Sequence, residues 1–180
     1  MKLLKDFIIP FVGLKEGKHE FTYQIENTFF EHFEYDDFNN VALKGTLVFD
    51  KKSTFFELFF HVEGIVNVNC DLTTEPFDLT INDDFKLLVK FGYEYNDDNE
   101  EILIIPQGDY EINVAQYFYE LVILALPAKR IHPGIEDGTL QSDMLDKLQE
   151  LSPKGLEEKE ETSEEIDPRW NTLKRLLTDK

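Results

Sequence analysis

The stretch from residue 54 to residue 63 constrains the fold most, because its apolar and polar side chains alternate with a period of two. One face of the extended chain carries apolar residues and the other carries mostly charged ones, with Phe59 as the exception. This alternation is typical of a strand that packs one face on a core and exposes the other to water. The apolar face consists of Phe56, Leu58, Phe60 and Val62.

Similar runs of β-forming residues occur before and after this stretch. Turn-forming residues, among them Gly64, separate the runs, so consecutive strands are expected to pair as antiparallel neighbours. The polar residues at 96–100 fit a loop, and the aromatic and acidic segment 29–38 fits a short helix or an ordered loop. The other predicted strands are 4–11, 18–25, 41–50, 65–70, 77–81, 85–93 and 101–105.

The period changes after residue 113, where apolar residues recur every three or four positions. This spacing predicts a helix that Asn113 caps and Pro127 ends, and that packs across the sheet. The sequence therefore predicts an α+β fold. Its form is either a curved antiparallel β-sheet or an open barrel, with one main packed helix and a C-terminal tail carrying short helices.

Residues 134–180 contain few apolar side chains and many acidic ones, which is typical of a flexible segment. We therefore expect a sheet-helix domain at 1–133 and a largely flexible acidic tail at 134–180. Short helices are predicted inside the tail at 143–151 and 168–177, and the first of them can alternatively belong to the folded domain. Trp170 lies on an apolar stripe of the second helix, which suits docking.

The chain carries 37 acidic and 18 basic residues, a formal net charge of −19. Such a charge disfavours broad contact with nucleic acid and accelerates encounter with a basic partner, although many acidic proteins carry it only for solubility. The N-terminal residues do not resemble a signal peptide, and no apolar run is long enough to cross a bilayer. Because Cys70 is the only cysteine, no intramolecular disulfide is possible, and we expect a cytoplasmic protein.

The sequence indicates no catalytic, cofactor-binding or metal-binding residues. Its four histidines are scattered, and the acidic groups at 83–84 and 97–100 fit solvated turns better than calcium loops. Asp71 is expected to raise the pKa of the neighbouring Cys70 thiol, which leaves that thiol unreactive. The cations Lys129 and Arg130, with His132, follow the predicted helix. They can contact phosphate, but they are more often cations that complement the helix dipole.

Three segments, in this order, resemble the bacterial YceD family (domain of unknown function 177), the large ribosomal RNA subunit accumulation proteins. The first, at 68–77, is similar to a Cys-x-x-Cys turn followed by Pro-Phe. The second, at 120–127 with a later histidine, is similar to the family's helix, and the third is similar to its Asp-Pro-Arg-aromatic ending. Thr73 replaces the second cysteine of the first segment, so a metal or redox role is not carried over. The third segment begins at Asp167.

The resemblance implies a non-enzymatic factor in large ribosomal subunit assembly and 23S ribosomal RNA accumulation. Such a factor would bind a ribosomal protein, a pre-50S particle or precursor RNA, of which direct RNA binding is disfavoured by charge. A metal-dependent RNA-processing hydrolase that uses clustered carboxylates is the alternative, and a purely structural acidic protein is a third possibility. The oligomeric state is left open. The candidate interaction residues are Cys70, Pro76, Phe77, Lys129, Arg130, His132, Asp167, Pro168, Arg169, Trp170 and Leu173.

Overall fold

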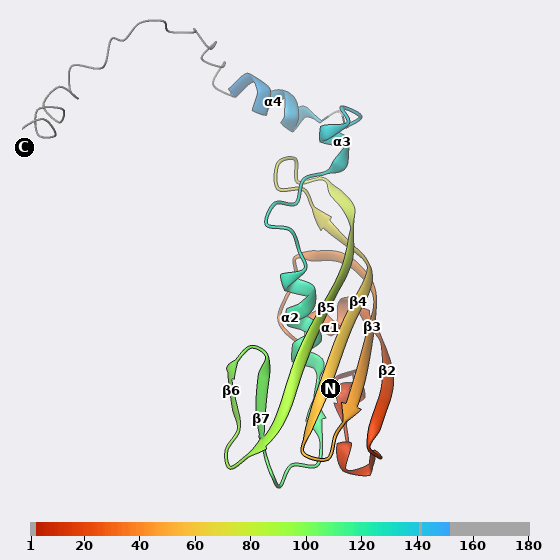
Figure 1. Ribbon diagram of the computed structural model, residues 1–180. Helices are drawn as coiled ribbons and strands as arrows, with labels where there is room; N and C mark the ends of the chain where they lie inside the picture. The colour runs from red at the N-terminus through yellow and green to blue at the C-terminus, as the bar shows by residue number, and fades with distance from the viewer. Residues whose placement is uncertain (1–2, 141, 152–180) are drawn as a thin grey trace, which may run out of the picture. The chain divides into compact units, whose positions relative to one another are not determined.

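The computed structural model describes residues 3–140 and 142–151 (Figure 1). The chain divides into two units, Met1–Gln141 and Ser142–Lys180. The described element of the second unit is α4 (Asp143–Leu151), which coincides with the helix predicted there. The predicted helix at 168–177 lies outside the described residues, and the boundary at residue 133 stays a prediction.

The first unit contains a six-stranded mixed sheet with the order β2-β3-β4-β5-β7-β6. Strands β2 to β5 pair as antiparallel neighbours, as the sequence predicted. The sheet is open, with β2 and β6 at its edges, and does not close into a complete barrel (Figure 1). The strands are β2 (Gly17–Glu26), β3 (Phe38–Lys51), β4 (Phe55–Asn69), β5 (Pro76–Gly92), β6 (Asn96–Asn99) and β7 (Ile102–Pro106).

Strand β4 runs without interruption through Gly64, where a break between two strands was predicted. Gly64 pairs with Leu43 of β3 and has a φ of +144°. A Cβ at this position would overlap the carbonyl oxygen of Ala42. The glycine therefore permits a close approach of two backbones inside the sheet. In the sequence, such a glycine looks the same as a glycine in a turn.

Strand β5 is also continuous, and the predicted turn at Asp83 and Asp84 is wrong. Both aspartates pair with β4, opposite Val62 and His61. Within the described residues, no strand pairs with the other edge of β5 before Leu88. This half of β5 is therefore an edge strand, where water can solvate carboxylates.

The strands after β5 were predicted as an antiparallel continuation, but β7 runs parallel to β5. The chain leaves β5 at Gly92, forms β6 at the outer edge, and returns as β7 between β5 and β6. The polar segment predicted as a loop therefore contains strand β6. Its hydrogen bonds to β7 hold this polar, exposed strand in place.

The strand predicted at 4–11 is largely wrong. Two 3-10 helices, η1 (Leu3–Phe7) and η2 (Phe11–Gly13), flank the two-residue β1 (Ile8–Ile9), which pairs with β8 (Ile112–Asn113). Phe7, Ile9 and Phe11 of this segment are nevertheless buried, so tertiary packing and not strand pairing explains their spacing. Residues 29–38 begin as α1 (Asn27–Glu31), the short helix predicted as one of two options.

Helix α2 (Ala115–Leu124) confirms the main predicted helix, and it packs against β4 and β5 while α1 packs against β2 and β3 (Figure 1). The N-cap residue is Val114 and not the predicted Asn113, but the Asn113 side-chain oxygen still accepts a hydrogen bond from the backbone N–H of Ala115 at 2.9 Å. Phe118, fully buried on α2, contacts the aromatic rings of Phe7, Tyr23 and Phe60. A mixed sheet and a few helices thus form the predicted α+β class.

Tyr23 carries the one buried side-chain polar atom that lacks a hydrogen-bond partner within the described residues. Burial, and secondly the negative charge of Asp6, raise the pKa of its hydroxyl from 10 to about 12. We expect Tyr23→Phe to raise the free energy of unfolding at neutral pH by about 1 kcal/mol, because an unpaired hydroxyl no longer has to be buried. Urea denaturation followed by circular dichroism measures this change.

The raised pKa also predicts how the difference between Tyr23→Phe and the wild type depends on pH. Below pH 10, the pKa of the hydroxyl in the unfolded chain, Tyr23 is neutral in both states and its ionisation costs no stability. Between pH 10 and about 12 the unfolded chain releases the proton while the folded chain keeps it, so the wild type loses stability. The advantage of Tyr23→Phe should therefore grow by about 2 kcal/mol across this window. The exposed Tyr110→Phe is the matched control, and an equal effect of both variants would contradict the assignment.

Candidate functional site

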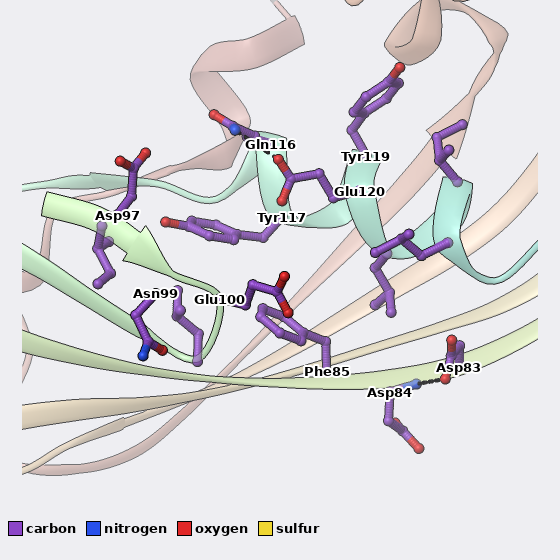
Figure 2. Close-up of a pocket in the computed structure, with 15 residues that line it drawn as sticks. Asp83, Asp84, Phe85, Asp97, Asn99, Glu100, Gln116, Tyr117, Tyr119 and Glu120 are labelled. Carbon is purple, nitrogen blue, oxygen red and sulfur yellow. Dashed lines mark hydrogen bonds between the residues drawn. The ribbon is translucent and has the colours of Figure 1, made fainter. Parts of the chain in front are cut away.

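A groove of about 560 Å³ opens between α2, β5 and the β6–β7 hairpin (Figure 2). Five carboxylates line it, and no Lys, Arg or His is among its lining residues within the described part of the chain. They come from three separate regions: two from β5, two from the β6 strand and the turn after it, and one from α2. The acidic residues are Asp83, Asp84, Asp97, Glu100 and Glu120.

Asp83 occupies an unusual position, because it lies on the core face of β5. Its pairing partner in β4, Val62, is fully buried, and Ile81, two residues before it on the same face, is also buried. Asp83 itself is exposed, since the groove opens at this position. The carboxylate is thereby placed beside apolar side chains and not on the solvent face of the sheet.

Hydrogen bonds hold several of the acidic groups in place without neutralising them. The Tyr117 hydroxyl donates to the Tyr95 hydroxyl, which donates in turn to Asp97 at 3.2 Å. Burial raises the pKa of the Tyr117 hydroxyl above its usual value, and Tyr95, Asp97 and Glu120 raise it further. Figure 2 shows the Tyr117 hydroxyl directed toward Asp97. The carboxylates of Asp97 and Glu120 therefore lie close enough to the Tyr117 hydroxyl to disfavour its ionisation.

Cationic partners for these carboxylates are scarce. Asp84 lies 2.8 Å from the Nδ1 atom of His61, on the outer face of the sheet. Asp83, Asp97, Glu100 and Glu120 form no ion pair with a Lys, Arg or His within the described residues. An external cation at any of these four carboxylates therefore would not have to displace an internal one.

Apolar side chains form the remainder of the groove. Phe85 and Tyr117 stack with their ring centroids 6.4 Å apart, and the buried Leu103 and Leu121 also line the groove. Leu124 is 80% exposed at the same groove, which is unusual for a leucine beside a core. A ligand with both apolar and positively charged groups matches this surface.

Among residues 3–140 and 142–151, no three His, Cys, Asp or Glu side chains lie close enough together to hold a metal ion. The five groove carboxylates therefore include no such group of three. Their arrangement suits several separate cationic groups on one partner better than a single ion.

The sequence-predicted residues within the described region gather elsewhere, at the turn between β4 and β5. The backbone N–H of His132 donates to the Cys70 sulfur at 3.3 Å, and the rings of His132 and Phe77 lie 5.5 Å apart. Pro76 is exposed at the start of β5. The buried Thr73, which replaces the second cysteine of the resemblance, donates a hydrogen bond from its side chain to the Cys70 sulfur. Hydrogen bonds and packing therefore hold this turn.

The expectation that the Cys70 pKa is raised is wrong. Burial raises the pKa of this thiol, but hydrogen bonds from Thr73, from the backbone of His132 and from the backbone of the turn lower it by more. The net shift is therefore downward. Cys70 is buried with about 1% of its surface exposed, so the lowered pKa does not make it accessible to a reactant.

Arg130 ties the segment after α2 to the same turn. It exchanges backbone and side-chain hydrogen bonds with Asp71, and its guanidinium lies 3.4 Å from Asp71 and 3.8 Å from Asp37. Arg130 therefore pairs with carboxylates and not with the last carbonyls of the helix. His132 caps the following short helix, α3 (Pro133–Glu136), through its Nδ1 atom, while Lys129 is exposed.

The third group of predicted residues, Asp167, Pro168, Arg169, Trp170 and Leu173, lies outside the described residues. Sequence reasoning missed the groove because it assigned the acidic pairs to turns. One signal was present: Asp83 interrupts an apolar period-two pattern between Ile81 and Phe85. A carboxylate on the apolar face of a strand either destabilises the core or lines an opening in it.

These observations define the class of the protein: an α+β protein with an acidic groove and a hydrogen-bonded turn. The family model described as large ribosomal RNA subunit accumulation protein YceD matches residues 58–177, and the chain belongs to this family. The match spans most of β4 and all of β5, α2, the groove and the Cys70 turn. No curated protein and no solved structure matches the chain.

The family resemblance predicted from three short segments is thus confirmed. The family is named for accumulation of ribosomal RNA and not for an enzymatic reaction. No helix in the described part of the chain is long and apolar enough to span a membrane.

Proposed function

We propose that the chain is a non-enzymatic factor in large ribosomal subunit assembly that acts by binding a basic ribosomal protein. Membership of the YceD family supplies the connection with large-subunit ribosomal RNA. The observation that carries the binding mode is the groove, which presents five carboxylates and no basic side chain within the described residues.

Electrostatics favours a protein ligand over RNA. Each phosphate that approaches the groove meets uncompensated carboxylates, and the net charge of −19 extends this repulsion over the surface. The same charges attract a Lys- or Arg-rich protein and accelerate its association. Such binding would shield the basic protein until it is delivered to the precursor particle in the cytoplasm.

The residues at the Cys70 turn remain proposed contacts with the same particle. Lys129 and Pro76 are exposed there, whereas Cys70 and Phe77 are buried and would act by holding the turn in shape. A metal-dependent hydrolase gains no support from the described residues, since the acidic side chains do not group around a common point.

Affinity capture of the tagged protein from lysate, with and without nuclease treatment, tests this function. We expect basic large-subunit ribosomal proteins to co-purify after nuclease treatment and to be released as the salt concentration rises, because the attraction between exposed charges is screened. Capture of precursor RNA without nuclease, together with loss of all ribosomal proteins once nuclease is added, would contradict a protein ligand. Mass spectrometry and RNA sequencing of each sample distinguish these results.

A further inference from the structure

The groove lies beside a free edge of the sheet. Strand β7 pairs with β5 only between Leu88 and Gly92, where the Leu88 N–H donates to the Glu101 carbonyl at 2.8 Å. Residues that share the parity of Leu88 turn their N–H groups to the same side. Toward the start of β5 these are Lys86, Asp84 and Asn82, and no described strand pairs with them on that side.

Asp83 already accepts a hydrogen bond from one of these edge N–H groups. Its side-chain oxygen accepts a hydrogen bond from the Asp84 N–H at 2.8 Å (Figure 2). Charged side chains at an unpaired edge commonly prevent unwanted strand pairing. A Lys or Arg that pairs with Asp83 would compete for this oxygen and free the Asp84 N–H for a new backbone partner.

We propose that an extended basic segment of the partner adds as a strand to the edge of β5, alongside Asn82 to Lys86. This inference rests on the proposed function, since it specifies how the basic ribosomal protein is held. Main-chain hydrogen bonds to β5 supply affinity, and alternate side chains supply specificity, as in other cases of strand addition.

Charge complementarity identifies the occupant as basic. Alternate side chains of the added strand point into the groove, where they meet Asp83, Glu120 and the Phe85–Tyr117 pair. The side chains between them point to the outer face of the sheet, where the Asp84 side chain is 79% exposed. Lys86 does not repel the segment strongly, because it pairs with Glu57 at 2.9 Å and lies over the Phe59 ring.

The proposal predicts the behaviour of a short synthetic peptide that alternates arginine with valine. We expect the double variant Asp83→Asn with Glu120→Gln to bind it about tenfold more weakly than the wild type, because two cation partners are lost. The matched control is Glu16→Gln with Glu20→Gln, which removes the same charge from exposed positions outside the groove and should retain binding. Fluorescence anisotropy measures each affinity.

Backbone pairing has its own readout. A peptide of the same sequence, N-methylated at the alternate residues whose N–H groups face β5, cannot donate to β5 and should bind about tenfold more weakly. In hydrogen exchange, the amides of Asn82, Asp84 and Lys86 should gain protection only with the unmodified peptide. Equal affinity of the two peptides would overturn strand addition, and equal affinity of the two double variants would overturn the groove as the site.

Comparison with affinity capture separates this inference from the proposed function. If ribosomal proteins co-purify with the wild type and with Asp83→Asn, Glu120→Gln equally, the inference fails and the function stands. If neither the peptide nor any basic ribosomal protein binds, both fail.

Discussion

Replacing Phe118 with alanine is expected to lower the free energy of unfolding by about 4 kcal/mol. The ring is fully buried between α2 and the sheet, where it contacts Phe7, Tyr23 and Phe60. Gly45 of β3 leaves the space for it, since a Cβ there would lie 2.7 Å from the Phe118 Cε1 atom. Truncation would leave a cavity that rigid strands cannot close. Urea denaturation monitored by circular dichroism gives the change.

Leu124→Ala is the matched control for Phe118→Ala, because it truncates an apolar side chain on the same helix at a position that is 80% exposed. Its effect should stay within about 0.5 kcal/mol. A loss below about 1.5 kcal/mol for Phe118→Ala would show that the core rearranges around the site or that α2 contributes little to the fold.

The periodicity of the sequence predicted which face of the stretch at 54–63 is buried, and this part of the prediction is correct, because Phe56, Leu58, Phe60 and Val62 of β4 are all buried. It did not predict where the strands end. Gly64 and the pair Asp83 and Asp84 are turn-forming residues, yet all three lie inside long strands. Local propensity favours a turn at each position, but hydrogen bonding to neighbouring strands outweighs it.

The position of β7 required tertiary information. Its five residues, Ile102–Pro106, are mostly apolar and fit any buried strand, so their order cannot distinguish parallel from antiparallel pairing. The same limit applies to the groove, whose carboxylates lie far apart in sequence. Residues 70–77, to which the family resemblance pointed, form one contiguous turn, and Arg130 and His132 form hydrogen bonds with it.

The Cys70 turn also shows why a neighbouring charge is a poor guide to a pKa. Asp71 is adjacent in sequence, but its carboxylate is engaged with Arg130. The hydrogen bonds that reach the sulfur come from Thr73 and from His132, and the latter is distant in sequence. Their donors stabilise the thiolate more than burial disfavours it.

Gly64→Ala is expected to lower the free energy of unfolding by about 3 kcal/mol, although it adds a single methyl group. The φ of +144° is strained for any residue with a Cβ, and the new atom would also overlap the Ala42 carbonyl oxygen and approach the Leu43 Cα at 2.9 Å. Backbone atoms cannot move aside as a flexible side chain can, so β3 and β4 would have to separate locally. Thermal and urea denaturation should both report the loss.

Gly108→Ala provides the control for Gly64→Ala, because a Cβ there would meet no atom within 4 Å and the residue is not at positive φ. It should leave the stability unchanged or raise it slightly, since alanine restricts the unfolded chain. If both alanine variants were equally stable, Gly64 would be an ordinary strand residue and the close approach of β3 and β4 would be wrong. A selective loss at Gly64 would instead establish that β4 is continuous in solution. The pairing register would then extend without a break from Val62 to Val66, the register that sets Asp83 and Ile81 of β5 on the face that lines the groove.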